Sequence, residues 1–370
     1  MLNRIGIVTV GRSDFGLLHP LIIKLKNYKK IKTTIFAAGG HFSNFSGNTI
    51  DEVKKLKIKI DYKIYCSRPD DSKHSVSLSF SEALKQFSQK FIKSKINSIV
   101  LLGDRYEMFA AAIAACNLGI KIFHIGGGCT TLGAIDNKYR FSISYLSDYH
   151  FVDLFAYKKK LINIGISSNN IFNTGSLGAI NVKSVKKKSL KSIENELKTK
   201  LNKKIILFTY HTTTLYTNDD VKFVNECLNY FKNKKEYKII ISNPNEDHSR
   251  KKITNIYNKF KRFKNFILVK NLGYENYANL LNYAKFMIGN SSSGIIEAAS
   301  YNLPVLNLGK RQSGRLTSKN VMNIENYNKK RLIKKLNFFT NVNFKIKKIK
   351  NIYLNSKSYN EITKKIAKLS

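Results

Sequence analysis

The sequence predicts an α/β fold made of two doubly wound, Rossmann-like domains, and three observations support this prediction. Short apolar segments alternate with segments whose apolar residues recur at helical spacing. This alternation stops in a lysine-rich stretch and then starts again. The chain has 370 residues, which indicates two domains at about 100 to 200 residues per domain. Strands that are apolar on both faces and alternate with helices form parallel sheets with helices on both sides.

The first series begins with RIGIVTV at 4–10, a β-branched run that ends in the loop GRSDFG and predicts a strand. The next segment, FGLLHPLIIKLKNY, predicts a helix. Further strands are predicted by TTIFAAGG at 33–40 and by IKIFHIGGG at 120–128. Residues 98–119 predict another strand at their start, followed by a helix. Ligands of such sheets bind at the carboxyl ends of the strands. We therefore expect a site at the loops GRSDFG, GGHFS, GDRYE and GGGCTTLGAID.

The second series follows residues 181–204, which are rich in Lys, Ser and Asn and predict a linker with some helix. Strands are predicted within 205–211, 237–247, 265–273, 286–301 and 304–309. The tail SYNEITKKIAKLS predicts a closing helix. The expected organisation is an N-terminal domain over 1–180, a C-terminal domain over 205–355 and the closing helix over 356–370. Two such domains facing each other across a cleft make the GT-B fold.

The net charge of +41 comes from 65 Lys and Arg residues against 24 Asp and Glu, and a pI near 10 usually indicates a nucleic-acid-binding protein. Here 55 of the basic residues are lysines spread over the whole chain, and no RNP, KH, zinc-finger or basic-zipper pattern accompanies them. We attribute the charge to a Lys- and Asn-biased composition and expect no specific nucleic-acid partner.

The cysteines Cys66, Cys116, Cys129 and Cys227 lie far apart without a CxxC pair, so we expect neither a metal site nor a disulfide framework. This usage fits a reducing cytoplasm. The first apolar run is broken at Gly11 and is too short for a signal segment or a membrane span, and no other stretch approaches about 18 apolar residues. We expect a cytoplasmic protein without a membrane partner, and a homo-oligomer is compatible with the sequence.

Arginine is informative because it is scarce. Six of the ten arginines lie in segments rich in Gly, Ser and Asp, where a planar guanidinium suits a phosphate or a carboxylate: Arg12, Arg105, Arg140, Arg250, Arg311 and Arg315. Arg12 follows the first strand, and Arg311 and Arg315 lie in GKRQSGR after the last predicted strand. These three are candidates for binding an anion, with a surface arginine as the alternative for Arg12.

The strongest local motif is GNSSSGIIEA, in which an apolar strand ends at Gly289 and a helix follows three serines. Ser291 and Ser292 offer hydroxyls, Gly294 allows close approach of a ligand, and a helix N-terminus with free N–H groups favours a phosphate. Glu297, expected in the first turn, could accept hydrogen bonds from a ribose. The alternative is a serine cap completed by Glu297 as a capping box. We favour the anion site because one cap needs one serine and not three.

The acid–base candidates are Asp104 and Glu107 in GDRYE and Asp136 in GAID. Glu107 lies three residues after Asp104 across a helix start, so both carboxylates can face one side, where close carboxylates have divergent pKa values. A structural ion pair with an arginine is equally compatible with Asp104. Asp136 and Arg140 have i, i+4 spacing, and a surface pair is the alternative.

Two histidines complete the candidates. His211 ends a strand within TYHTTT, and His41 follows two glycines. For each, a ligand-binding role and a buried, hydrogen-bonded histidine are about equally compatible with the sequence.

The order of these loops resembles the hydrolysing UDP-N-acetylglucosamine 2-epimerases. These enzymes make N-acetylmannosamine for sialic acid, and relatives act on a diacetamido sugar nucleotide for legionaminic acid. The resemblance is carried by GRSDFGLL, GGHFS, GDRYE, GG-x-x-T-x-GAID-x-x-x-R, GNSSSGIIEA and RQSGR, and runs from about residue 4 to about residue 325. It implies a GT-B fold.

The resemblance also implies roles for particular residues. The nucleotide diphosphate would be held by Arg12, His211, Ser291, Ser292 and Arg315, the ribose by Glu297, and the sugar would lie near Asp104, Glu107 and Asp136. The implied reaction needs no metal and no redox cofactor. The C2 proton is removed as the nucleotide leaves C1, a glycal forms, and water then adds with inverted C2 configuration.

The chain departs from the family pattern near the sugar. Cys129 stands where a carboxylate is usual, Asn137 where a second acidic residue often follows, Phe141 where His is usual, and Gly126 where His or Glu is common. We interpret this as a retained nucleotide site with a changed sugar or reaction. The alternatives are a non-hydrolysing epimerase, a GT-B glycosyltransferase, and a sugar-nucleotide-binding protein without turnover.

Overall fold

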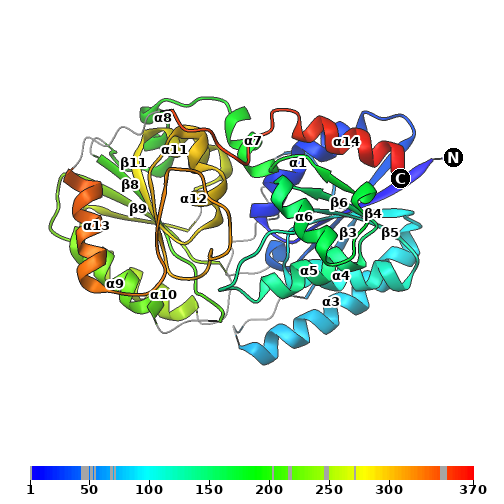
Figure 1. The fold of residues 1–370 in the computed structure, drawn as a ribbon, viewed down its shortest axis with the longest axis horizontal. Helices are drawn as coiled ribbons and strands as arrows, with labels where there is room; N and C mark the ends of the chain where they lie inside the picture. Colours follow the sequence, from blue (N-terminus) through cyan, green and yellow to red (C-terminus); the bar gives the residue numbers. More distant parts are fainter. Residues whose placement is uncertain are drawn as a thin grey trace. The chain divides into compact units, whose positions relative to one another are not determined.

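The computed structural model describes residues 2–42, 50, 53, 56–66, 70, 72–201, 204–215, 219–245, 250–270, 272–341 and 348–370. The chain forms two compact units (Figure 1). The first unit comprises residues 1–129, 135–177 and 355–370, and the second comprises 130–134 and 178–354. Each unit contains one parallel sheet with interleaved helices, as predicted.

The first unit contains a seven-stranded parallel sheet in the order β3-β2-β1-β4-β5-β6-β7. Its strands are β1 (Asn3–Thr9), β2 (Ile31–Ala38), β3 (Tyr62–Ile64), β4 (Ser98–Leu102), β5 (Lys121–Ile125), β6 (Tyr149–Val152) and β7 (Ile171–Asn173). The four predicted strands correspond to β1, β2, β4 and β5. The sequence did not predict β3, β6 and β7, which have only three or four residues each.

Helices cover both faces of this sheet. They are α1 (Arg12–Lys26), α3 (Lys73–Ser94), α4 (Tyr106–Asn117), α5 (Asp136–Leu146), α6 (Phe155–Asn163) and α14 (Ser358–Leu369), with the short 3-10 helices η1 (Gly39–Phe42) and η2 (Ser168–Asn170). Buried alanines of α4 pack in one core with Phe87 and Phe91 of α3. The tail helix α14 packs on α1, where the Tyr359 hydroxyl donates to the carbonyl oxygen of Leu17 at 2.9 Å.

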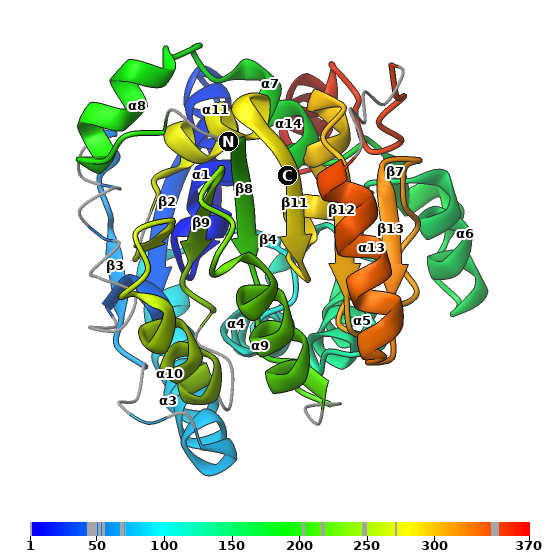
Figure 2. The ribbon, with the colours of Figure 1, turned by 90° about the vertical axis from the view of Figure 1, so that its left-hand side faces the viewer.

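The second unit contains a six-stranded parallel sheet in the order β10-β9-β8-β11-β12-β13, seen in Figure 2. Its strands are β8 (Lys204–Thr209), β9 (Tyr237–Ser242), β10 (Phe266–Val269), β11 (Ala284–Gly289), β12 (Val305–Leu308) and β13 (Val321–Ile324). The first five correspond to the predicted strands. The four residues of β13 were not predicted.

The helices of this unit are α7 (Leu177–Ser184), α8 (Leu190–Leu197), α9 (Asp220–Phe231), α10 (Arg250–Phe260), α11 (Tyr274–Tyr283), α12 (Ser292–Ile296), η4 (Ala298–Tyr301) and α13 (Lys329–Asn341). Side chains of β8 alternate between two cores, as the period of a strand requires. Ile206 and Phe208 face α9, α10 and α13, whereas Ile205 and Leu207 face α7, α8 and α11.

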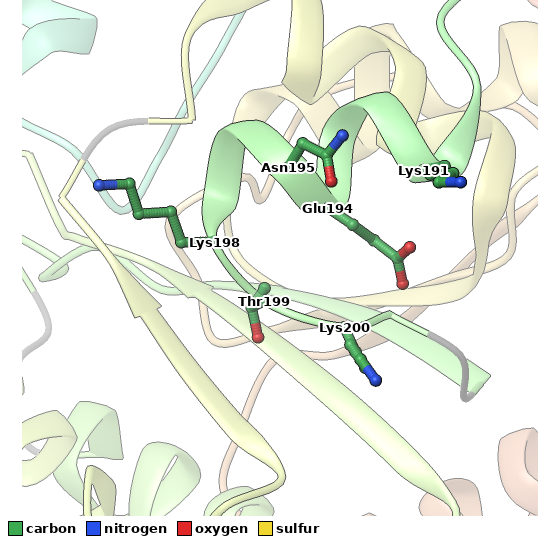
Figure 3. Close-up of a pocket in the computed structure, with 6 residues that line it drawn as sticks. All are labelled: Lys191, Glu194, Asn195, Lys198, Thr199 and Lys200. Carbon is green, nitrogen blue, oxygen red and sulfur yellow. The ribbon is translucent and has the colours of Figure 1, made fainter.

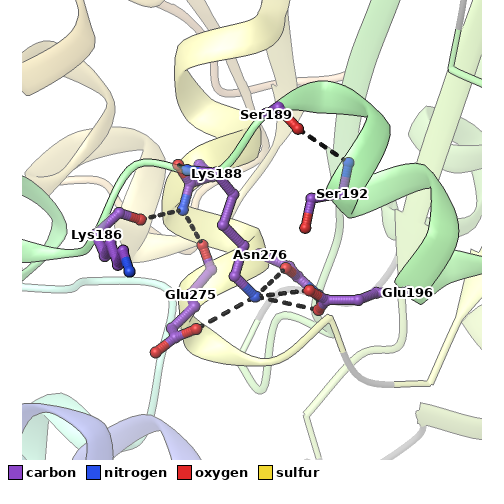
Figure 4. Close-up of polar contacts among 8 residues, drawn as sticks. Lys186, Lys188, Ser189, Ser192, Glu196, Glu275 and Asn276 are labelled. Atoms are coloured by element: carbon purple, nitrogen blue, oxygen red, sulfur yellow. Dashed lines mark hydrogen bonds and ion pairs between the residues drawn. The ribbon is translucent and has the colours of Figure 1, made fainter.

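Residues 181–201 and 204, the described part of the predicted linker, belong to the second unit. Figure 4 shows the Lys188 amino group between the carboxylates of Glu196 and Glu275, at 2.9 Å and 3.2 Å. The Lys188 backbone N–H donates to the Asn279 side chain at 2.8 Å, and Ser189 caps α8. These contacts attach the segment to α11. Among the described residues, no helix combines the length and the apolar character needed to cross a membrane.

Candidate functional site

The predicted site residues divide between the two units. Those of the first unit are Arg12, His41, Asp104, Glu107, Asp136 and Arg140, and those of the second are His211, Ser291, Ser292, Gly294, Glu297, Arg311 and Arg315. All lie at or after the carboxyl end of a strand, where parallel sheets bind ligands. Arg12 begins α1, but its side chain lies outside the described part of the chain.

Asp104 and Arg140 form an ion pair in the first unit. Asp104 follows β4 after Gly103, which has a positive φ of 82°. The Arg140 side chain extends from α5, is 3% exposed, and also donates to the backbone oxygen of Cys129 at 2.9 Å. The surface-pair alternative for Arg140 is therefore wrong. The guanidinium links the Asp104 carboxylate to the glycine loop, defined here as residues 126–135 between β5 and α5. Of the Asp104 side chain, 24% remains exposed.

Glu107 has a different environment, although it lies only three residues after Asp104. Its side chain is 1% exposed, and its carboxylate lies 3.3 Å from Nε of Arg105. Gly39, with φ of 54°, packs against it, and a Cβ at this glycine would lie 2.4 Å from Oε1 of Glu107. Asp104 and Glu107 thus each have an arginine of their own, and Glu107 is the less accessible carboxylate.

His41 is buried behind the same edge of the sheet. Its Nε2 lies 2.8 Å from Oγ1 of Thr9, the last residue of β1. Burial lowers the pKa of His41 to about 4, so its ring is neutral at pH 7. Of the two interpretations of His41 from the sequence, the structure agrees with the buried, hydrogen-bonded histidine.

The glycine loop joins β5 to α5 and ends beside Asp136, which is half-buried at the start of α5. Residues 130–134 of this loop belong to the second unit. There the backbone N–H of Leu132 donates to the carbonyl oxygen of Ser313 at 2.9 Å. Gly133 has no room for a side chain, since a Cβ would lie 2.4 Å from the Lys310 oxygen. Residues 130–134 therefore pack against the arginine loop, defined here as residues 309–315.

Asn290 organises the site of the second unit. Its buried side-chain amide accepts from the backbone N–H of His211 at 2.7 Å and donates to the His211 carbonyl at 2.8 Å. Its own carbonyl accepts from Gln312 at 2.8 Å and lies 3.5 Å from Nη1 of Arg311. Asn290 thus connects three segments: the loop after β8, the arginine loop, and its own loop at residues 290–293, called the serine loop here.

His211 is buried, and its Nδ1 accepts a hydrogen bond from the Asn245 backbone N–H at 3.0 Å. Burial, with a contribution from Arg311, holds the pKa of His211 well below its usual value. A neutral ring that accepts at Nδ1 carries its hydrogen on Nε2. This nitrogen can therefore donate to an anion.

The serine loop caps α12 with Ser291, whose Oγ accepts from the Ser293 N–H at 3.4 Å. Ser291 and Ser293 hydroxyls lie 3.0 Å apart, and Ser292 is half-buried beside them. Gly294 packs closely on Val305, where a Cβ would lie 3.0 Å from Cγ1. Since α12 has only five residues, its dipole is small, and hydroxyls and guanidinium groups must supply most of any phosphate binding.

Glu297 terminates α12 instead of lying in its first turn, so the capping-box alternative is wrong. Its Oε2 is buried without a hydrogen-bond partner, and a Cβ at Gly178 would lie 3.0 Å from its Oε1. Burial raises the pKa of Glu297 to about 8. The neighbouring Tyr277 hydroxyl is also buried, and although it contributes to the Glu297 pKa, it forms no hydrogen bond of normal geometry.

Sequence reasoning missed Asn290, Gln312, Asn245 and Tyr277. Asn290 lies within GNSSSG, where an asparagine next to glycine and serine is typical of a turn. Its role depends on a contact with His211, 79 positions earlier. A hollow of about 500 Å³ on the second unit is lined by residues that are not site candidates. Figure 3 shows these residues: Lys191, Glu194, Asn195, Lys198, Thr199 and Lys200.

A family model described as UDP-N-acetylglucosamine 2-epimerase matches residues 23–367. A Campylobacter jejuni protein named GDP/UDP-N,N'-diacetylbacillosamine 2-epimerase (hydrolyzing) is 37% identical over 87% of this chain and 84% of its own. A Legionella pneumophila protein named UDP-N,N'-diacetylbacillosamine 2-epimerase (hydrolyzing) is 32% identical over 88% and 86%. The Escherichia coli polysialic acid biosynthesis protein P7 is 30% identical over 87% and 83%.

Solved structures agree in fold. The Methanocaldococcus jannaschii UDP-GlcNAc 2-epimerase in complex with UDP-GlcNAc and UDP has a TM-score of 0.83, at 19% identity over 99% of both chains. The S. aureus MnaA-UDP co-structure has a TM-score of 0.83, at 17% identity over 99% of this chain and 96% of the other. These similarities confirm the predicted GT-B fold class.

Proposed function

Because the chain belongs to the family of UDP-N-acetylglucosamine 2-epimerases, we propose that it hydrolyses a UDP- or GDP-linked N-acetylated amino sugar and releases the free 2-epimeric sugar. The observation that carries this proposal is the 37% identity, over most of both chains, to a relative named as a hydrolysing 2-epimerase. The geometry of the site residues within each unit supports it.

The second unit supplies the nucleotide site. The diphosphate is bound by Nε2–H of His211, the hydroxyls of Ser291 and Ser292, and the guanidinium groups of Arg311 and Arg315. Hydrogen bonds in which at least one group is charged are stronger than neutral ones, and those to a departing diphosphate strengthen further as its negative charge grows. Gly294 lets α12 pack closely behind these groups. The diphosphate-binding role that the resemblance implies for Arg12 stays a prediction, because its side chain lies outside the described residues.

Glu297 binds the ribose. Its Oε2 lacks a partner in a buried position, which is costly unless a ligand supplies hydroxyl groups. A ribose diol offers two hydroxyls.

The first unit supplies the acid–base groups. A base takes the C2 proton, a C1–C2 double bond forms, and the C1–O bond breaks with its electron pair leaving on the nucleoside diphosphate. Water then adds its hydroxyl to C1 of the glycal, and an acid returns a proton to C2 on the opposite face. Asp104, which pairs with Arg140, and half-buried Asp136 are accessible for these transfers. Glu107, the third predicted acid–base residue, is 1% exposed and pairs with Arg105, so its part in these transfers stays a prediction.

We place the sugar in the diacetamido class and the reaction in nonulosonic acid biosynthesis. Relatives named for N,N'-diacetylbacillosamine and for polysialic acid biosynthesis support this assignment. Gly126, Cys129 and Phe141 replace polar or charged residues and fit a sugar whose substituents are amide and methyl groups. All four cysteines are free thiols, which fits a reducing cytoplasm.

The test is incubation with UDP- and GDP-linked acetamido and diacetamido sugars in D₂O and, separately, in H₂¹⁸O. We expect free sugar and nucleoside diphosphate in equal amounts, with deuterium at C2 and ¹⁸O at C1 of the sugar and none in the phosphate. A 2-epimeric sugar nucleotide would indicate a non-hydrolysing epimerase, and binding without product would indicate a protein without turnover. Either result would overturn the proposal.

A further inference from the structure

His124 is a buried histidine that the reaction scheme above does not use. It lies in β5, and both of its ring nitrogens are engaged. Nε2 lies 2.9 Å from the carbonyl oxygen of Gly103, and Nδ1 lies 3.0 Å from Oγ of Ser144. A carbonyl oxygen can only accept, so Nε2 carries the hydrogen and Nδ1 accepts from the Ser144 hydroxyl. Burial lowers the pKa of His124 to about 3, in agreement with a neutral ring.

The two ends of this bridge lie next to the acid–base groups. Gly103 directly precedes Asp104, and Ser144 lies in α5 one turn after Arg140. The His124 bridge therefore joins the end of β4 to α5, which are the two segments that the Asp104–Arg140 ion pair also joins.

The glycine loop packs on the same bridge. A Cβ at Gly127 would lie 2.7 Å from Oγ of Ser144 and 3.1 Å from Nδ1 of His124. The bridge thus contacts the Asp104 turn, α5 and the loop that carries Cys129.

We propose that His124, held by Ser144, is a positioning residue that fixes the Asp104 turn and the glycine loop against α5. The proposal rests on the catalytic role proposed for Asp104. Without the bridge, the peptide that carries Asp104 can shift, and a displacement of about 1 Å can cost about 100-fold in rate. Nucleotide affinity is unaffected, because the nucleotide-binding groups argued above lie in other loops.

The test compares His124→Ala, His124→Gln and Ser144→Ala with a matched control, His150→Gln. His150 pairs with His124 in register on β6 and is equally buried. Within the described residues its ring nitrogens form no hydrogen bond of normal geometry, although the Ser147 backbone contributes to its pKa. We expect kcat for sugar release to fall roughly 10- to 100-fold in His124→Ala and Ser144→Ala, with KM and UDP affinity unchanged. His124→Gln, whose amide can donate to Gly103 and accept from Ser144, restores much of the rate.

Amide hydrogen exchange does not depend on turnover, so it tests the positioning role of His124 separately from the proposed epimerase activity. Amide hydrogen exchange of the peptides covering 103–107 and 126–129 accelerates in His124→Ala and Ser144→Ala and is unchanged in His150→Gln. If the unmodified protein released no sugar, the proposed function would fail while the exchange data still tested the bridge. Unchanged exchange and kcat in both variants, or an equal loss of kcat in His150→Gln, would overturn the positioning role.

Discussion

Replacing Asn290 by Ala should both destabilise the second unit and weaken nucleotide binding. The side-chain amide is fully buried and bonds to the backbone N–H and C=O of His211, at 2.7 Å and 2.8 Å. Alanine leaves both groups unsatisfied, at a cost of about 1 to 3 kcal/mol each, or about 4 kcal/mol in total. The backbone carbonyl of residue 290, which Gln312 contacts, remains, so the change isolates the side chain.

For a unit of this size, about 1 kcal/mol shifts Tm by about 2 to 4 °C, so we expect the transition of the second unit to fall by about 8 to 16 °C. Because His211 is then no longer held, UDP affinity measured by calorimetry below the transition should fall at least about tenfold, or about 1.4 kcal/mol.

The matched control is Asn320→Ala, which removes one buried hydrogen bond to the Leu303 carbonyl at 2.8 Å, on a segment without site residues. It should lower Tm by a smaller amount and leave UDP affinity intact. If Asn290→Ala melted within about 2 °C of the unmodified protein and bound UDP normally, the organising role of Asn290 would be refuted.

Three further predictions concern the site residues of the two units. Ser292→Ala and Arg315→Ala should each weaken UDP or GDP affinity by about 1.5 to 3 kcal/mol, and unchanged calorimetric titrations would contradict the diphosphate site. Asp104→Asn and Asp136→Asn should reduce sugar release by about 10²- to 10⁴-fold with nucleotide affinity retained, whereas near-normal turnover would contradict the acid–base assignment. The folded pKa of Glu297 is raised to about 8 from 4.5, so its contribution to stability is full below about pH 4.5 and is lost as pH rises through 8. Glu297→Gln should therefore flatten the decrease in stability between pH 5 and 8 seen in parallel denaturant titrations, and identical pH profiles would refute the buried, protonated carboxyl.

The fold class and the places of the loops were determined by the sequence itself. Apolar runs that alternate with helical periods require parallel sheets, and in such sheets the loops after the strands must share one edge. The motifs GNSSSG and RQSGR could be found because their residues are neighbours along the chain. The strands that were missed, such as Tyr62–Ile64 and Val321–Ile324, have three or four residues. Runs of this length are at the limit of what periodicity detects, and Phe266–Val269 and Val305–Leu308, also of four residues, were predicted.

The partners of the site residues were decided by tertiary structure. Arg140 pairs with Asp104, 36 positions away, because β5, which leads to α5, is the neighbour of β4 in the sheet. Glu107 packs against Gly39 because β2 and β4 flank β1, so the segments that follow these two strands lie at the same edge. Local spacing indicated only that Asp104 and Glu107 can face one side and that Asp136 and Arg140 lie one helical turn apart, and it could not reveal these partners. Asn290 reaches His211 across 79 positions because β11 pairs with β8. Such contacts depend on strand order, which no local period encodes, and burial then determines which of the charged groups stay ionised.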